Sequence, residues 1–361
     1  MKLSQRYAIV MACSVLLLAV TAISCRKHKM DDMGMSEKNI DYPAAYVVNG
    51  ESSTVSVINL TTNTVTETIE LMSAGGSMAM WPHHASLFNI FDVNRISIGV
   101  PGVDLSAGHS GNMGDMKGKV IVLDGRKGTI IKDMEVPVMN HNAAFSPNGK
   151  EIWTSQMEMK GKVLVYDAQT YALKNTINVG MEPAEVTFSA DGTRAYVANG
   201  GDNTLSVIDP ATKAVIKTIP VGANPVGAWV GYDGKMYLDN EDGKSISVID
   251  VASNAVVQTI PLGFMPGSAA HNAARKELWV TDPENGKVHY WTWDAAGNQW
   301  IHGGIFTTGA GAHAVAFTND GNVAYVTNQL AASVSVINIS DHSKIKDVAV
   351  GKKPNGIVIK Q

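Results

Sequence analysis

Histidine recurs at the start of repeat units along this chain, and this placement suggests a transition-metal site. His83, His141 and His313 each directly follow the residue that opens a unit, and His84 follows His83. Imidazoles held on separate rigid segments are the ligands that copper, iron and zinc sites use. We therefore take these four histidines as candidate metal ligands that meet at one place. The alternative is that they fill the interior as hydrogen-bonding side chains.

Methionine is concentrated in the same half of the chain, which points to copper among the metals. Ten of the 17 methionines lie between positions 72 and 181, and only two follow position 181. His109 is followed by Met113 and Met116, and we add these three residues to the candidate metal ligands. Thioether sulfur together with imidazole favours Cu(I). The alternative is that methionine fills irregular gaps in the core.

Two further segments depart from the repeat. The stretch VDLSAGHSGNMGDMKG (103–118) is Gly-rich, polar and longer than a minimal turn, and such loops often carry binding residues. The unit that opens at Pro266 contains His271, Trp291 and Trp293, which we predict to form a ligand-binding cluster. Aromatic side chains in this unit could instead cover a longer hairpin.

The elements that must position these side chains are short strands. A pattern close to Ser-Val-Ile-Asp occurs seven times. The aromatic residues of the preceding strand are spaced 43, 41, 42 and 46 residues apart, and they are Trp153, Tyr196, Tyr237, Trp279 and Tyr325. This is the period of a four-stranded propeller blade, and each strand alternates apolar with polar or small residues. The chain is therefore predicted to be all-β, a β-propeller of four-stranded blades.

The ends of the repeat region predict how the ring closes. The region begins at a second strand, 45–49, and ends with an isolated first strand, 354–359. We expect the C-terminal strand to join the N-terminal blade, which removes a free sheet edge. Seven third strands with this closure give seven blades. Six blades is the alternative if 82–138 is not a true blade.

The motifs Tyr-Val-Ala-Asn (196–199) and Ser-Val-Ile-Asp (206–209) resemble those of YVTN-repeat β-propellers, over roughly residues 44–361. The resemblance implies the fold and says little about function, because the motif consists of packing and turn residues. The pair His83-His84 is distantly similar to the copper propeller of nitrous oxide reductases. The blade-opening histidines loosely resemble those of haem d1 propellers. The former family uses seven copper-binding histidines and a cysteine-bearing second domain, whereas at most five histidines of this chain, with His271 included, are candidates for the channel. Neither activity is expected.

The N-terminal sequence predicts export and a lipid anchor. Lys2 and Arg6 precede an apolar stretch, 8–22, and Ala22-Ile23-Ser24-Cys25 resembles a bacterial lipobox. We expect residues 1–24 to be a lipoprotein signal peptide, Cys25 to be acylated, 25–43 to be a flexible tether and 44–361 to be the propeller. The other cysteine, Cys13, lies in the signal, so no disulfide is expected. The predicted location is the cell envelope, on the outer membrane.

The net charge and the absence of catalytic motifs limit the functions that we expect. Removal of residues 1–24 takes away two basic residues and no acid, so the formal net charge falls from −4 to −6. Nucleic-acid binding is therefore not expected. No nucleophile elbow or phosphate-binding glycine loop is present. We expect a monomeric binding scaffold for a protein or small molecule rather than an enzyme. A copper-binding or redox protein is the first alternative and a lactonase-like hydrolase the second.

Overall fold

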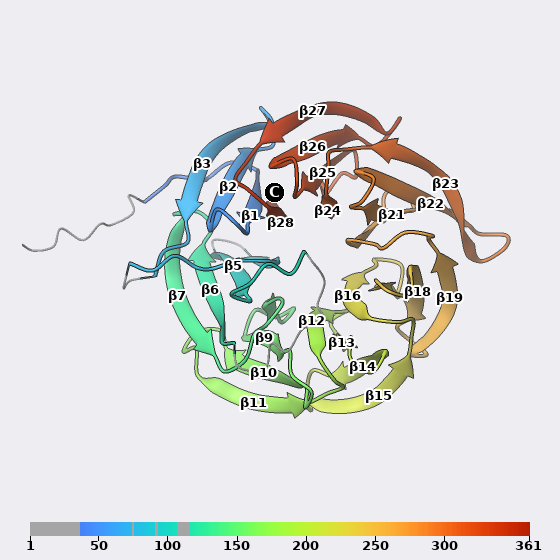
Figure 1. The fold of residues 1–361 in the computed structure, drawn as a ribbon, viewed down its shortest axis with the longest axis horizontal. Helices are drawn as coiled ribbons and strands as arrows, with labels where there is room; N and C mark the ends of the chain where they lie inside the picture. Colours follow the sequence, from blue (N-terminus) through green and yellow to red (C-terminus); the bar gives the residue numbers. More distant parts are fainter. Residues whose placement is uncertain (1–36, 74–75, 91–92, 107–115) are drawn as a thin grey trace, which may run out of the picture. The chain divides into compact units, whose positions relative to one another are not determined.

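The protein is a seven-bladed β-propeller, seen down the ring axis in Figure 1. The structure is a computed structural model that describes residues 37–73, 76–90, 93–106 and 116–361. Cys25, His109 and Met113 lie outside the described residues. Within the described residues no helix is long and apolar enough to cross a membrane. The prediction of an all-β propeller is confirmed.

Each blade is a four-stranded antiparallel sheet. Blade 1 consists of β4 (Ala85–Ile90), β5 (Val93–Val100), β6 (Gly118–Asp124) and β7 (Thr129–Val136). Blade 2 consists of β8 (Ala144–Phe145), β9 (Glu151–Gln156), β10 (Lys162–Asp167) and β11 (Leu173–Asn178). Blade 3 consists of β12 (Pro183–Phe188), β13 (Ala195–Asn199), β14 (Thr204–Asp209) and β15 (Ala214–Pro220).

The other blades repeat this arrangement. Blade 4 consists of β16 (Pro225–Val230), β17 (Lys235–Asn240), β18 (Ser245–Asp250) and β19 (Ala255–Pro261). Blade 5 consists of β20 (Ala269–Asn272), β21 (Glu277–Asp282), β22 (Lys287–Asp294) and β23 (Gln299–Thr307). Blade 6 consists of β24 (Ala312–Phe317), β25 (Val323–Asn328), β26 (Ser333–Asn338) and β27 (Ser343–Ala349). The closing blade consists of β28 (Pro354–Lys360), β1 (Ala44–Asn49), β2 (Thr54–Asn59) and β3 (Thr64–Glu70).

Both ends of the described chain meet in the closing blade, as the sequence predicted. β28 pairs antiparallel with β1, and Tyr46 faces Val358 in the register. Figure 1 shows β28, in red, beside the blue strands of the N-terminal part. Residues 82–138 form a complete blade, so the six-bladed alternative is wrong.

The apolar core consists of seven wedges between neighbouring blades. One wedge joins Val48 and Val57 of the closing blade to Ile98 and Leu123 of blade 1, for example. The second-strand aromatics lie in these wedges, and a tyrosine hydroxyl can reach the next blade: Tyr196 donates to the Asn254 side chain at 3.1 Å. Burial of aromatic side chains at every blade interface drives ring closure, since one blade cannot cover both of its faces.

Polar repeat residues tie the strands of a blade together. Asn199, which ends the Tyr-Val-Ala-Asn strand, donates to Thr204 and Ser206 on the next strand, each at 3.0 Å. Asp209 accepts the backbone N–H of Ala211 at 2.8 Å and so shapes the turn into β15. The same bond to the N–H two residues on forms at Asn59, Asp124, Asp167 and Asn338. Asp250 accepts the N–H of Ser253, three residues on.

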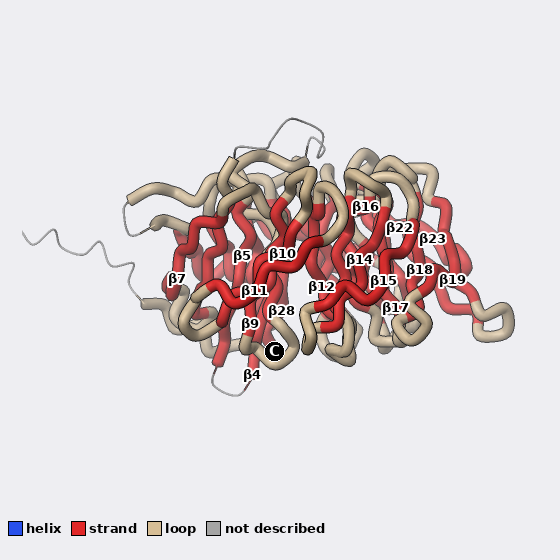
Figure 2. Tube along the Cα trace, turned by 90° about the horizontal axis from the view of Figure 1, so that it is seen from below, coloured by secondary structure: helices blue, strands red, loops and turns tan. Residues whose placement is uncertain are grey.

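The packed chain starts before β1. Ile40 is fully buried, and its N–H donates to the carbonyl of Arg126 in blade 1. Residues 37–43, which were predicted to be part of the tether, thus lie against the ring. The side view in Figure 2 shows strands running between two faces of loops. The innermost strands of all blades run in the same direction along the ring axis. Residues at equal repeat positions therefore lie near the same face of the ring.

Candidate functional site

Four imidazoles meet where the inner segments of blades 1, 2 and 6 begin. The His83 ring stacks on the His84 ring with centroids 4.4 Å apart, and the His141 ring lies 4.4 Å from that of His83. The His313 ring is 5.7 Å from His83 and 5.4 Å from His84. The structure thus brings together all four histidines that the repeat alignment selected. We call His83, His84, His141, His313 and the carboxylate described next the histidine cluster.

Glu185 completes the cluster and was not predicted from the sequence. One carboxylate oxygen of Glu185 accepts from Nδ1 of His84 at 2.6 Å and from Nδ1 of His141 at 3.1 Å. Its side chain is only 2% exposed. Burial by itself raises the pKa of the Glu185 carboxyl, but the two imidazoles outweigh burial and hold that pKa well below its usual range. Glu185 is therefore a buried anion.

A signal for Glu185 was present in the repeat. Glu185 stands two residues after the blade-opening Pro183, the position that His84 has in blade 1. In the other five blades that position holds small or amide residues, which are Asn142, Gly227, Ser268, Ala314 and Gly356. A carboxylate at a position that holds small or amide residues in five other blades marks a departure from packing.

A backbone carbonyl of the closing blade orients the His313 ring. Its Nδ1 lies 2.8 Å from the backbone carbonyl oxygen of Asn355, which can only accept. Burial, followed by the neighbouring His84, lowers the pKa of His313 to about 3. His313 is therefore neutral at pH 7, with its proton on Nδ1 and a lone pair on Nε2.

The hydrogen bonds leave ring nitrogens able to bind a cation. Because carboxylate and carbonyl oxygens only accept, His84, His141 and His313 all carry a proton on Nδ1. Nε2 of His84 is buried and has no hydrogen-bond partner among the described residues. Two groups of three side chains each have ligand atoms within 4.8 Å of one another: His83, His84 and His313, and His84, His141 and Glu185.

A small cavity of about 50 Å³ adjoins the cluster. Its walls include Trp229, Met265 and Leu105, the last from the insertion that the sequence singled out. Lys353 anchors this part of the insertion, with Nζ 3.0 Å from Ser106 Oγ and 3.5 Å from an Asp104 carboxylate oxygen. The described part of the insertion thus forms part of the wall beside the histidines.

The one methionine selected from the sequence that the structure describes does not join the cluster. Met116, the described member of the predicted His109 group, is 38% exposed and does not line the cavity beside the cluster. Met139 is buried against Leu105 and Met157 in a small apolar group. The thioether that lines the cavity belongs to Met265, which the sequence analysis did not select.

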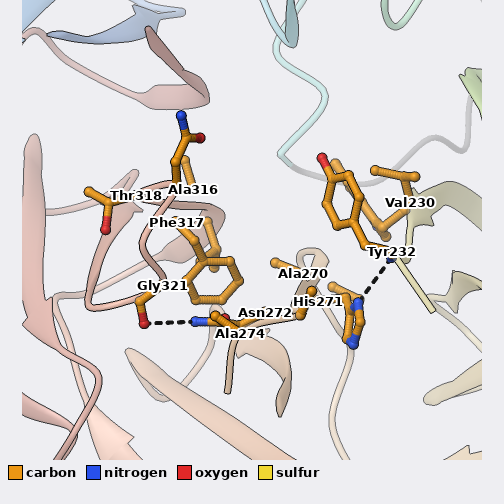
Figure 3. Close-up of a pocket in the computed structure, with 15 residues that line it drawn as sticks. Val230, Tyr232, Ala270, His271, Asn272, Ala274, Ala316, Phe317, Thr318 and Gly321 are labelled. Atoms are coloured by element: carbon orange, nitrogen blue, oxygen red, sulfur yellow. Dashed lines mark hydrogen bonds between the residues drawn. The ribbon is translucent and has the colours of Figure 1, made fainter. Parts of the chain in front are cut away.

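The second predicted group divides between a pocket and the core. His271 lines a pocket of about 530 Å³ between blades 4, 5 and 6, shown in Figure 3. Its Nδ1 accepts the backbone N–H of Tyr232 at 3.1 Å. Trp291 is buried in the wedge between blades 4 and 5, and Trp293 packs against Trp300 there. Trp291 and Trp293 therefore do not line this pocket with His271.

Trp229 lies between the two cavities and lines both. Its ring centroid is 5.4 Å from that of His84, and its indole N–H donates to the buried carboxyl of Asp239. The equivalent position in the other blades holds a smaller residue, such as Ala144 in blade 2 or Ala316 in blade 6. One large side chain thus separates the histidine cluster from the larger pocket.

Comparisons with known proteins agree with this fold. A sequence model of the choice-of-anchor I domain family matches residues 152–355. The uncharacterized protein YncE of Salmonella typhimurium is 32% identical over 94 residues, which cover 26% of this chain and 26% of YncE. The matched stretch is thus about a quarter of that relative's length.

Solved structures share the propeller at low identity. The periplasmic gluconolactonase PpgL of Pseudomonas aeruginosa has a TM-score of 0.68 at 15% identity, over 88% of this chain and 99% of PpgL. Hydrazine synthase of Kuenenia stuttgartiensis has a TM-score of 0.61 at 19% identity, over 76% of this chain and 88% of the synthase chain. At such identities the likeness shows the fold alone.

Proposed function

This chain belongs to the choice-of-anchor I domain family, and we propose that it is an exported β-propeller that binds one copper ion through His83, His84 and His313. The observation that carries the proposal is the buried Nε2 of His84, which has no hydrogen-bond partner among the described residues. Its Nδ1 is held by Glu185. A carboxylate behind a ligand imidazole is a common outer-shell partner in metal sites.

The donor set suits a transition metal. Metal–nitrogen bonds of about 2.0–2.1 Å place two imidazole nitrogens on one ion roughly 3–4 Å apart. The candidate ligand atoms already lie within 4.8 Å of one another, so small side-chain rotations suffice. Copper is favoured among divalent metals because it forms the most stable complexes with such ligands. The thioether of Met265 beside the cavity is a soft donor that also suits Cu(I).

The charge of Glu185 supports a cation in the cluster. An isolated buried anion is costly, and here it is balanced by the imidazoles on either side. A bound metal ion would supply the compensating charge instead and would bring redox capacity to the site. His141 donates to the same carboxylate oxygen as His84, which keeps Glu185 aimed at His84.

The proposed setting is the cell envelope. The lipobox-like sequence that ends in Cys25, which lies outside the described residues, supports export and acylation. The described propeller provides the rigid scaffold, and the N-terminal residues would attach it to a membrane. We propose the outer membrane, since Arg26 rather than an acidic residue follows Cys25.

Copper competition between the full-length protein and a chromophoric chelator tests the proposal. We expect one copper per chain, and His84→Ala should weaken binding by at least about 100-fold. Glu185→Gln should weaken it by about 10- to 100-fold, the usual cost of losing an outer-shell partner. The matched control is His302→Ala, because His302 is exposed on the outermost strand of blade 5.

Equal copper binding by the wild type, His302→Ala and a folded His84→Ala variant would reject the site. Circular dichroism and the melting temperature establish that each variant is folded. If zinc or iron binds with the same dependence on His84 while copper does not, the copper assignment is wrong.

A further inference from the structure

The pocket that contains His271 lies toward the opposite end of the inner strands from the histidine cluster. The histidine cluster surrounds their first residues, such as His313 of blade 6, whereas the pocket is lined by later ones, such as Phe317. Its volume of about 530 Å³ is in the range of small-molecule sites. Trp229 closes it off from the cluster.

Blade 5 departs from the repeat at the residues that line this pocket. Blades 2, 3 and 6 have a phenylalanine near the end of the inner strand (Phe145, Phe188 and Phe317), where blade 5 has His271. Blade 3 continues with Ser-Ala-Asp-Gly (189–192), whereas blade 5 continues with Asn-Ala-Ala-Arg (272–275). Within this turn Ala274 is smaller than its counterpart Asp191 in blade 3, and Ala274 lines the pocket. Such a departure from scaffold positions is where function is expected.

The lining is uncharged and mostly apolar. The 15 lining residues include no Asp, Glu, Lys or Arg. Burial lowers the pKa of His271, so its imidazole is neutral at pH 7. The polar side chains are largely occupied: the Asn272 amide donates to the carbonyl of Gly321 at 3.2 Å, and His271 accepts from Tyr232. A charged ligand would lose its hydration here without compensation.

The aromatic side chains that line the pocket favour a planar ligand. Figure 3 shows the Phe317 and Tyr232 rings on opposite sides of the pocket, with Ala270 between them. Tyr232 is 68% exposed, an unusual state for a large aromatic side chain. Aromatic rings favour stacked or edge-to-face contacts with other π systems. Small alanines beneath the rings leave room for a slender ligand.

We propose that this pocket binds a planar, mainly apolar small molecule between Phe317 and Tyr232. This site is separate from the proposed copper site and does not depend on it. Binding would use the apolar faces of the rings, with the alanines of blade 5 as the floor.

Isothermal titration of the metal-free full-length protein with 2-naphthol tests the inference. The matched control ligand is decahydro-2-naphthol, which has the same carbon skeleton and hydroxyl group but is puckered. We expect 2-naphthol to bind at one site and to bind at least about tenfold more tightly than the saturated alcohol. Ala273→Leu, which fills the pocket, should weaken 2-naphthol binding by about tenfold.

The matched control variant is Ala190→Leu. Ala190 occupies the equivalent turn position of blade 3 and is exposed, as Ala273 is. Ala190→Leu should bind 2-naphthol as the wild type does. Failure of 2-naphthol to bind up to its solubility limit would overturn the inference, as would equal binding of the two alcohols or equal effects of the two leucine variants. Retained copper binding in Ala273→Leu would show that the two sites are independent.

Discussion

Two carboxyls buried near the axis are in opposite electrostatic states. Glu185 faces two imidazoles, and they keep its pKa low despite burial. Asp239 is buried to the same degree, but the group that donates to its side chain is the indole N–H of Trp229. Burial, and then the charge of Glu241, raise the pKa of Asp239 well above its usual range. The nature of the partner thus decides which carboxyl is ionised.

Asp239→Asn should make the protein less sensitive to pH. A carboxyl whose pKa is raised in the folded state stabilises the fold less as pH rises above its unfolded value, near 4. The melting temperature of Asp239→Asn should therefore match that of the wild type near pH 4 and exceed it at pH 8. Asparagine still offers an oxygen to Trp229. A melting-temperature difference that does not change between pH 4 and pH 8 would contradict this assignment.

At the scale of single residues, the sequence predicted the histidines of the site but not their neighbours. The alignment of blade openings selected His83, His141 and His313 because equal repeat positions lie at equal depth in a ring. Glu185 was missed because only the first position after each opening was compared. Met265 and Trp229 were missed because their contribution depends on side-chain packing across blades, which no repeat pattern encodes.

At the scale of strands, glycines allow the segments that carry the histidines to approach one another. Gly99 of β5 lies against the opening of blade 2, where an added Cβ would be 2.6 Å from the His141 carbonyl oxygen and 2.6 Å from Asn142 Cα. Gly356 of β28 lies in the same way against His83 and His84. These contacts are with backbone atoms, which cannot move aside without shifting a strand.

Gly99→Ala should therefore destabilise the ring. Overpacking of a closed interface costs about 1–3 kcal/mol, and backbone contacts favour the upper end of that range. Urea denaturation measures the free energy of unfolding. Gly201→Ala is the control, because its added Cβ would come no closer than 3.0 Å to Met181 Cβ and 3.1 Å to Glu182 Oε2, so its neighbours need to shift only slightly. Equal unfolding free energies for the two variants would show that blades 1 and 2 are not closely packed at Gly99.

Strand positions were predicted well from the sequence, because alternation and turn chemistry are local. The Tyr-Val-Ala-Asn motif at 196–199 lies in β13 (Ala195–Asn199), and the Ser-Val-Ile-Asp motif at 206–209 lies in β14 (Thr204–Asp209). The first strands were harder to place. In blade 2 the inner strand is reduced to Ala144–Phe145, and the His141 segment before it has no ladder pairing of its own. Its conformation is set by neighbouring blades rather than by its own sequence.

At the scale of the whole molecule, membrane attachment depends on a single residue in our proposal. Cys25→Ser should move the protein from the membrane fraction to the soluble fraction of the envelope, because acylation supplies the apolar anchor. Immunoblotting after fractionation, with a labelled fatty acid as a second readout, measures the change. Ser24→Thr is a conservative control. Continued sedimentation of Cys25→Ser with membranes would mean that attachment has another cause.

Closure of the ring by β28 has a consequence for when the site can form during biosynthesis. The carbonyl of Asn355 is the acceptor that orients His313, and β28 follows all the other described strands in the chain. A growing chain that already contains every histidine still lacks this acceptor and still exposes an unpaired edge of β1. Metal capture would thus wait until translation has passed residue 360. For an exported protein, this delay would keep the site unassembled until the chain has crossed the inner membrane.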